Sequence, residues 1–172
     1  MKKIITLLAV IGMFSLQGCT TTTDSNYVDN DTIAEAFEIK AKNFYNDPID
    51  SPDEGYFIYG KFTPAIYSSD VVLIYRLSGI IDSNTPIWQL IPRTLFLSQG
   101  ELDYDFDFSK EDYTIYAGGT YNLALTPQYI NNQTFRIVIV PANLVQGVDK
   151  NSYPAVMSAL NIKESQIQKI NF

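Results

Sequence analysis

The chain has 172 residues, and its 12 Lys and Arg against 19 Asp and Glu give a formal net charge of −7 without any histidine. A chain this acidic lacks the basic surface that attracts nucleic acid, so we expect no nucleic-acid partner. Without histidine, Ser-His-Asp, Cys-His and zinc-hydrolase chemistry are excluded, and pairs of carboxylates remain as acid and base groups.

The N-terminus has the layout of a bacterial secretory signal. Lys2 and Lys3 precede an apolar run over residues 4–14, and small and polar residues follow. The sequence Leu16-Gln17-Gly18-Cys19 resembles the lipobox of bacterial lipoproteins, in which the cysteine is acylated and becomes the first residue after cleavage. We therefore expect a signal peptide over residues 1–18 and lipidation, with a palmitate-type acyl group, at Cys19. No other cysteine is left for a disulfide.

Lipidation would place the protein in the cell envelope, at the outer membrane. The sequence does not indicate whether it lies on the periplasmic face or on the cell surface. Loss of Lys2 and Lys3 with the signal makes the net charge about −9, so anionic headgroups would repel the domain. After the signal, no apolar run approaches the roughly 18–20 residues that a spanning helix needs. The expected membrane contact is therefore the lipid alone.

Residues 19–32 are predicted to be the lipidated cysteine and a flexible tether, because four threonines follow Cys19 and the segment is mostly polar. Asp31-Thr32-Ile33 resembles the Asp-Thr-aliphatic acceptor of general O-glycosylation in Bacteroidetes-type bacteria. This makes Thr32 a candidate glycosylation site.

From residue 33 onward the hydrophobic pattern is mostly of period two, which predicts strands. Strands are expected at 37–41, 56–62, 71–77, 87–97, 102–108, 113–117 and 135–140. The nearly continuous run at 71–77 is typical of a central strand covered on both faces, and Pro92 interrupts 87–97, which holds one or two strands. In 102–108, Leu102, Tyr104, Phe106 and Phe108 face one way, and three aspartates face the other.

The C-terminal region has a helical pattern instead. Pro154 suits the first turn of a short helix over residues 155–160, and residues 162–170 are predicted to add one or two helical turns. Ile167 and Ile170 would dock this tail on the sheets. The prediction for residues 33–172 is thus a single domain, an antiparallel β-sandwich of about seven to nine strands with a short C-terminal helical segment.

The domain also resembles a group of small lipoproteins of Bacteroidetes-type bacteria. The resemblance lies in four segments, 70–77, 88–96, 100–108 and 135–141. It implies a lipid-anchored β-rich domain and gives no indication of a ligand.

Two groups of carboxylates are candidate cation sites, since calcium prefers several carboxylate oxygens. The spacing of Asp103, Asp105 and Asp107 resembles the start of an EF-hand calcium loop. However, Phe108 stands where that loop has its glycine and Thr114 where it has its glutamate, so only a less regular cation site remains as a candidate. The alternatives are a solvated face or ion pairs of these aspartates with Arg76 or Arg136. The second group lies in a turn-rich loop that is otherwise expected to be solvated, and it comprises Asp47, Asp50, Asp53 and Glu54.

Aromatic residues are abundant, with 12 Tyr, 10 Phe and one Trp. They can fill a core, or they can form exposed platforms for a glycan; Tyr56, Tyr59, Tyr67 and Trp88 are the candidates for a ligand platform. Exposed aromatics in a shallow groove would favour a binding module.

The expected function is a lipid-anchored accessory or structural domain of the cell envelope that is not an enzyme and needs no cofactor. A carbohydrate- or surface-binding module that uses exposed aromatics is the alternative, with a glycan or an envelope protein as its partner. Asp105 and Asp107, about 7 Å apart along one strand face by strand geometry, are the one pair that could serve a glycosidase.

Overall fold

The computed structural model describes residues 34–46, 55–82 and 85–170. The predicted signal peptide, Cys19, the tether, Thr32 and the acidic loop with Asp47, Asp50, Asp53 and Glu54 lie outside the described residues.

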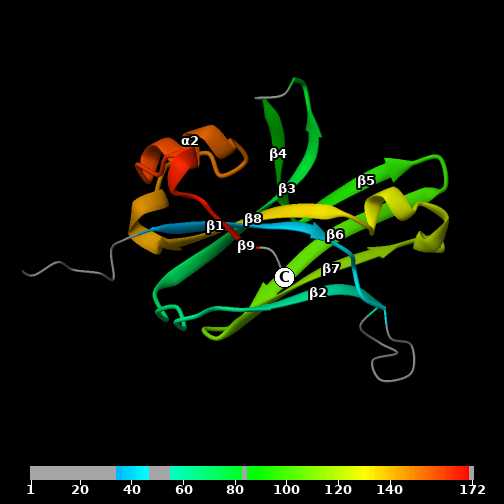
Figure 1. Cartoon of the computed structure of the whole chain (residues 1–172), viewed down its shortest axis with the longest axis horizontal. Coiled ribbons are helices and arrows are strands. Elements are labelled where there is room, and N and C mark those ends of the chain that lie inside the picture. Colours follow the sequence, from blue (N-terminus) through cyan, green and yellow to red (C-terminus); the bar gives the residue numbers. More distant parts are fainter. Residues whose placement is uncertain (1–33, 47–54, 83–84, 171–172) are drawn as a thin grey trace, which may run out of the picture.

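Two packed sheets form the domain, which confirms the predicted β-sandwich with a short C-terminal helix (Figure 1). The strands are β1 (Glu35–Lys42), β2 (Tyr56–Lys61), β3 (Asp70–Ile80), β4 (Pro86–Ile91), β5 (Arg93–Leu97), β6 (Gly100–Phe108), β7 (Asp112–Gly119), β8 (Gln133–Pro141) and β9 (Gln168–Ile170). One sheet has the order β4-β3-β8-β1-β9 and the other the order β2-β7-β6-β5. Neighbouring strands are antiparallel, except that β9 runs parallel to β1.

The main core lies between the sheets. Alternate residues of β6 and β7, such as Leu102, Tyr104 and Ile115, are buried there against Ile74 and Ile137 of the other sheet. Each fully buried aliphatic side chain contributes about 1.5–3 kcal/mol to folding. The predicted facing of Leu102 and Tyr104 is confirmed. Phe106 is only half-buried and Phe108 is exposed, because β6 extends beyond its neighbour β5 at this end.

A second core covers the outer face of the five-stranded sheet. Helix α2 (Tyr153–Ala159) packs on β3 and β8, and Val156 and Met157 are buried against Tyr75 and Val138. The Ser152 side chain accepts a hydrogen bond from the Ala155 N–H and Pro154 lies in the first turn, as helix N-termini prefer. Because both faces are covered, residues 72–76 of β3 are all buried, as the continuous apolar run predicted.

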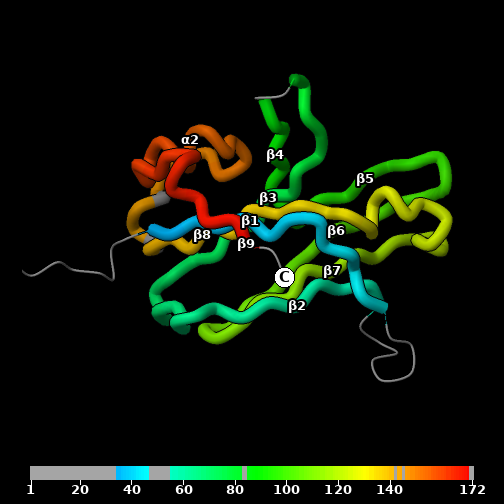
Figure 2. The backbone as a smooth tube through the Cα atoms, viewed as in Figure 1, coloured from blue at the N-terminus to red at the C-terminus, as the bar shows by residue number. Residues whose placement is uncertain are grey.

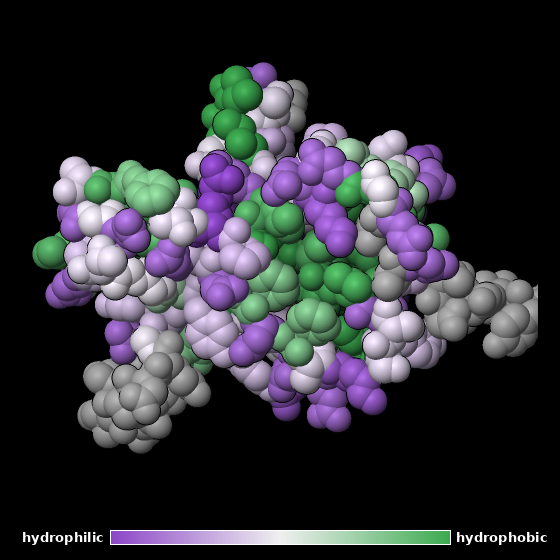
Figure 3. Space-filling model, turned by 180° about the vertical axis from the view of Figure 1, so that it is seen from behind, coloured by the Kyte–Doolittle hydropathy of each residue, from purple (hydrophilic) through white to green (hydrophobic). Residues whose placement is uncertain are grey.

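The segment around Pro92 is two strands that belong to different sheets. β4 pairs with β3, and β5 pairs with β6 after the chain crosses at Pro92, whose peptide bond with Ile91 is cis. With β3, β4 forms a hairpin that projects away from the sandwich (Figure 1). Figure 3 shows apolar side chains at its tip, where Ile80 and Ile81 are exposed.

The prediction of further helical turns over residues 162–170 is wrong. That segment has one 3-10 turn at Glu164–Gln166 and then β9, which pairs with the edge of β1 (Figure 2). The sheet edge satisfies the backbone of β9, and a short helix could not do so as fully. Ile167 is buried and Ile170 half-buried, so both dock as expected.

Further 3-10 turns lie at Leu123–Leu125, Pro127–Tyr129 and Ala142–Val145. Within the described ranges, no helix has the length and apolar character to cross a membrane.

Candidate functional site

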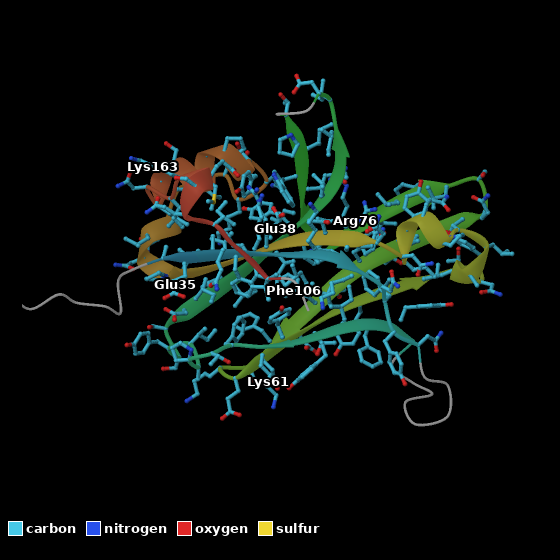
Figure 4. The ribbon with its side chains drawn as sticks, in the orientation of Figure 1. Glu35, Glu38, Lys61, Arg76, Phe106 and Lys163 are labelled. Atoms are coloured by element: carbon cyan, nitrogen blue, oxygen red, sulfur yellow. The ribbon has the colours of Figure 1, made fainter. Side chains whose placement is uncertain are left out.

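A groove opens where the two sheets end on the same side of the sandwich. Strand β9 is an edge strand of the five-stranded sheet, and β2 is an edge strand of the four-stranded sheet. Between them lies a hollow of about 590 Å³. We call this hollow the edge groove; Glu35 of β1 and Lys61 of β2 lie at its two sides (Figure 4).

Apolar side chains make up much of the edge groove. Phe37 and Ile139 come from the five-stranded sheet, Ile170 from β9, and Phe62 from the segment after β2. The polar lining residues are Glu35, Lys42, Lys61, Thr63 and Gln168. This mixture of an apolar surface and a few polar groups is typical of small-molecule binding sites.

An adjoining hollow of about 370 Å³ extends the edge groove along the segment between β2 and β3. It shares Glu35, Pro64 and Ile139 with the edge groove, and Tyr67 and Asp70 also line it. The Asp70 side chain accepts a hydrogen bond from the Tyr67 N–H at 2.8 Å, which holds this turn in shape. The two hollows therefore adjoin each other.

Gly60 explains why aromatic rings can pack beside the edge groove. Gly60 pairs with Tyr113 across β2 and β7, and a Cβ at Gly60 would lie 2.3 Å from atoms of the Tyr113 ring. The ring packs against Phe37 and Phe62, with centroid distances of 6.1 and 5.2 Å. Burial raises the pKa of Tyr113 to about 12, so this hydroxyl stays neutral at physiological pH.

Two of the four predicted platform residues lie at this surface. Tyr59 lines the edge groove and Tyr67 the adjoining hollow, and about half of each side chain is exposed. The Tyr59 hydroxyl donates a hydrogen bond to Asp112 at 3.1 Å, which fixes the direction of the ring.

The other two predicted platform residues lie elsewhere. Tyr56 is half-buried against the main core. Trp88 packs in the second core, with its ring beneath the Arg136 guanidinium at 4.2 Å, and its Nε1 is buried without a hydrogen-bond partner in the described structure. Trp88 is therefore part of the packing under α2 and does not form an exposed platform with Tyr59 and Tyr67.

The predicted ion pairs between the β6 aspartates and the arginines are wrong. Arg136 pairs with Glu38 and Glu164, and Arg76 donates to Gln133. Both arginines belong to the five-stranded sheet, whereas the aspartates point outward from the four-stranded sheet. Sequence alternation could not reveal that the two sets lie in different layers.

The three aspartates make local contacts instead of gathering around a shared centre. Asp107 accepts a hydrogen bond from the Tyr116 hydroxyl at 3.0 Å, and Asp105 accepts one from the Phe106 N–H at 2.8 Å. Asp103 is half-buried on the same face of β6. In residues 34–46, 55–82 and 85–170, no group of three or more His, Cys, Asp or Glu is arranged to hold a metal ion.

Sequence reasoning missed most of the edge groove. Phe37 and Ile139 read as ordinary strand residues, and Gln168 and Ile170 were expected in a helix. The sequence pointed to this surface only through Tyr59 and Tyr67, which were candidates for a ligand platform.

Comparisons with protein-family models, with curated proteins and with solved structures gave no match.

Proposed function

We propose that this domain is a non-catalytic carbohydrate-binding module of the bacterial cell envelope, tethered to the membrane through a lipidated Cys19. The observation that carries the proposal is the edge groove of about 590 Å³, which continues into a second hollow beside the exposed Tyr67. It favours a binding module over a purely structural domain.

The chemistry of the surface suits a saccharide. A pyranose ring has an apolar face that packs on aromatic and aliphatic side chains, and here Phe37, Tyr59 and Tyr67 provide such surfaces. Its hydroxyl groups need donors and acceptors at the rim, which Glu35, Lys61 and Gln168 provide. The two joined hollows match the elongated shape of an oligosaccharide.

The acidic groups support binding in preference to hydrolysis. Glycoside hydrolysis uses a pair of carboxylates on opposite sides of the bond that breaks. Among the described residues that line the edge groove, Glu35 is the single carboxylate. Asp70 lines the adjoining hollow, but its side chain is engaged with the backbone of Tyr67.

A glycan microarray probed with the full-length protein in detergent tests the proposal. We expect binding to a defined set of glycans, and a loss of about fivefold or more in affinity for Tyr67→Ala, because stacking on an aromatic ring contributes about 0.5–1.5 kcal/mol beyond the area that it buries. Tyr67→Phe should keep most of the affinity. Tyr45→Ala is the matched control, since Tyr45 is similarly exposed but lines neither hollow.

Failure to bind any glycan, or an equal loss of affinity with Tyr45→Ala and Tyr67→Ala, would contradict the proposal. A lipid-anchored structural role would then be favoured.

A further inference from the structure

Arg76 is a buried arginine on the inner face of β3, at the base of the projecting hairpin. It is 7% exposed, and its guanidinium carbon lies 4.6 Å from the centre of the Tyr104 ring and 5.8 Å from that of Tyr129. Figure 4 shows it in a different part of the molecule from Glu35 and Lys61 of the edge groove. It belongs to the side of the sandwich where β4 and β5 end the two sheets.

A set of buried hydrogen bonds fixes the orientation of the Arg76 side chain. Its Nε donates to Oε1 of Gln133 at 2.8 Å, and Nε2 of Gln133 donates to the carbonyls of Gln128 and Asn131 at 2.8 and 2.7 Å. The Tyr104 hydroxyl donates to the backbone carbonyl of Tyr129 at 2.6 Å, which holds the Tyr104 ring in place. The guanidinium is thus held rigidly before any ligand arrives.

No carboxylate in the described structure forms an ion pair with Arg76, and its two Nη atoms have no protein partner there. Arg136, the other buried arginine, pairs with two glutamates. A buried guanidinium without a counter-charge is costly, and burial lowers the pKa of Arg76. Its contacts are the Gln133 side chain and the faces of the Tyr104 and Tyr129 rings, and both Nη atoms remain available to a ligand.

The Arg76 side chain lines a hollow of about 480 Å³, and Arg93 of β5 lines it too. Ser78, Gln89 and Thr94 add polar groups, and no lining residue is acidic. Two of the chain's three arginines therefore meet at one hollow of an acidic protein. The exposed Phe96 provides an aromatic wall.

We propose that Arg76 and Arg93 form a second site, independent of the edge groove, which binds a small organic anion through its carboxylate or phosphate group. The planar fork of Arg76 suits an oxyanion that accepts two parallel hydrogen bonds. The hollow of about 480 Å³ has room for a ligand with an organic body beside its charged group. Phe96 and Tyr129 would contact that body.

Titration calorimetry on the full-length protein in detergent, with D-glucuronate, glucose 6-phosphate, glucose and inorganic phosphate as probes, tests this site. We expect at least one of the two sugar anions to bind at least tenfold more tightly than glucose, and the stronger of the two identifies the charged group. Inorganic phosphate should bind more weakly than that sugar anion.

Arg93→Gln should raise the Kd of the bound anion at least fivefold, and Arg76→Gln should raise it at least tenfold, because a hydrogen bond to a charged group is strong. Lys163→Gln is the control for the loss of one positive charge at an exposed position. Since Arg93 is exposed, Arg93→Gln keeps the test valid even if Arg76→Gln fails to fold.

The proposal would be overturned if glucose bound as tightly as the sugar anions, or if neither anion bound. It would also be overturned if Lys163→Gln weakened binding as much as Arg93→Gln. Tyr67→Ala in the hollow beside the edge groove should leave anion binding unchanged, so this result is separate from the microarray result.

Discussion

Arg136 connects the C-terminal segment to the sandwich through charged and aromatic contacts. Its Nε donates to Glu38 at 3.0 Å, and Nη1 donates to Glu164 at 2.6 Å and to the Tyr153 hydroxyl. Glu38 lies directly opposite Arg136 across β1 and β8, and both are buried. A carboxylate in this position depends on its partner, because water cannot replace the arginine.

Arg136→Ala should therefore destabilise the domain by about 3–5 kcal/mol, because it leaves Glu38 buried without a counter-charge. The double variant Arg136→Met, Glu38→Leu should regain much of that loss. Midpoints of urea unfolding at matched slopes measure both. If the double variant were less stable than Arg136→Ala, the account of this pair as a buried counter-charge would be wrong.

Glu164, the second partner, should matter much less. Burial would raise its pKa, but the hydrogen bond and the charge of Arg136 outweigh that effect and hold the pKa below its usual value. Stabilisation from a depressed carboxyl pKa is present above the unfolded-state pKa and is lost as the pH falls. Because the Glu164 side chain is 64% exposed, Glu164→Gln should cost about 1 kcal/mol or less at pH 7 in the same urea assay. A loss as large as that of Arg136→Ala would contradict this ranking.

Titration of Tyr113 should make the stability of the domain fall at alkaline pH. Its pKa is raised to about 12 by burial, whereas an unfolded tyrosine titrates near pH 10, so its contribution to stability is complete below pH 10 and is lost as the pH rises to 12. The loss should reach about 2 kcal/mol at pH 12. Urea unfolding followed from pH 8 to pH 12 should show a shallower decline for Tyr113→Phe than for the natural chain. Identical declines would exclude Tyr113 as the cause.

At the scale of elements, strand β6 shows how far alternation predicts facing. Leu102 and Tyr104 are buried and Asp105 is exposed, as the pattern predicted. Leu102→Ala should cost about 2–5 kcal/mol through lost burial and a cavity, whereas Asp105→Ala should cost about 1 kcal/mol or less. Denaturant midpoints of the two variants provide the comparison. A larger effect of Asp105→Ala would indicate that the aspartate face of β6, and not the Leu102 face, is turned toward the core.

Local pattern was enough to predict most strands, the helix at Pro154 and the sandwich as a class. It failed for charged residues on the covered outer face of the five-stranded sheet. Glu38 alternates with Phe37 and Ile39, a pattern typical of a solvent-exposed polar face, but Glu38 is buried and pairs with Arg136. It also failed for β9, whose partner Phe37 is far away along the chain from Gln168. The edge groove depends on that pairing, so no local pattern could reveal it.

At the scale of the whole molecule, the proposed protein is a domain with two hollows on opposite sides, tethered to a membrane. The edge groove lies beside β9 and β2, and the arginine site lies beside β4 and β5. A lipid at Cys19 would hold the domain near the membrane.

Cys19→Ala should release the domain from the membrane, since several acyl chains make a stable anchor and the net negative charge of the chain opposes binding to anionic lipid. Fractionation of cells after a high-salt wash measures the change. Retention of Cys19→Ala in the membrane fraction would contradict the lipid anchor without bearing on the edge groove.

The location of a bound glycan tests the central claim most directly. Backbone amide NMR shifts of the protein would be recorded during titration with the best glycan from the microarray. We predict that the largest shifts fall at the edge groove and its adjoining hollow, at Phe37, Lys61, Tyr67 and Gln168, with little change at Arg76. Shifts confined to any other surface, or no saturable shifts, would contradict the assignment of the edge groove as the binding site.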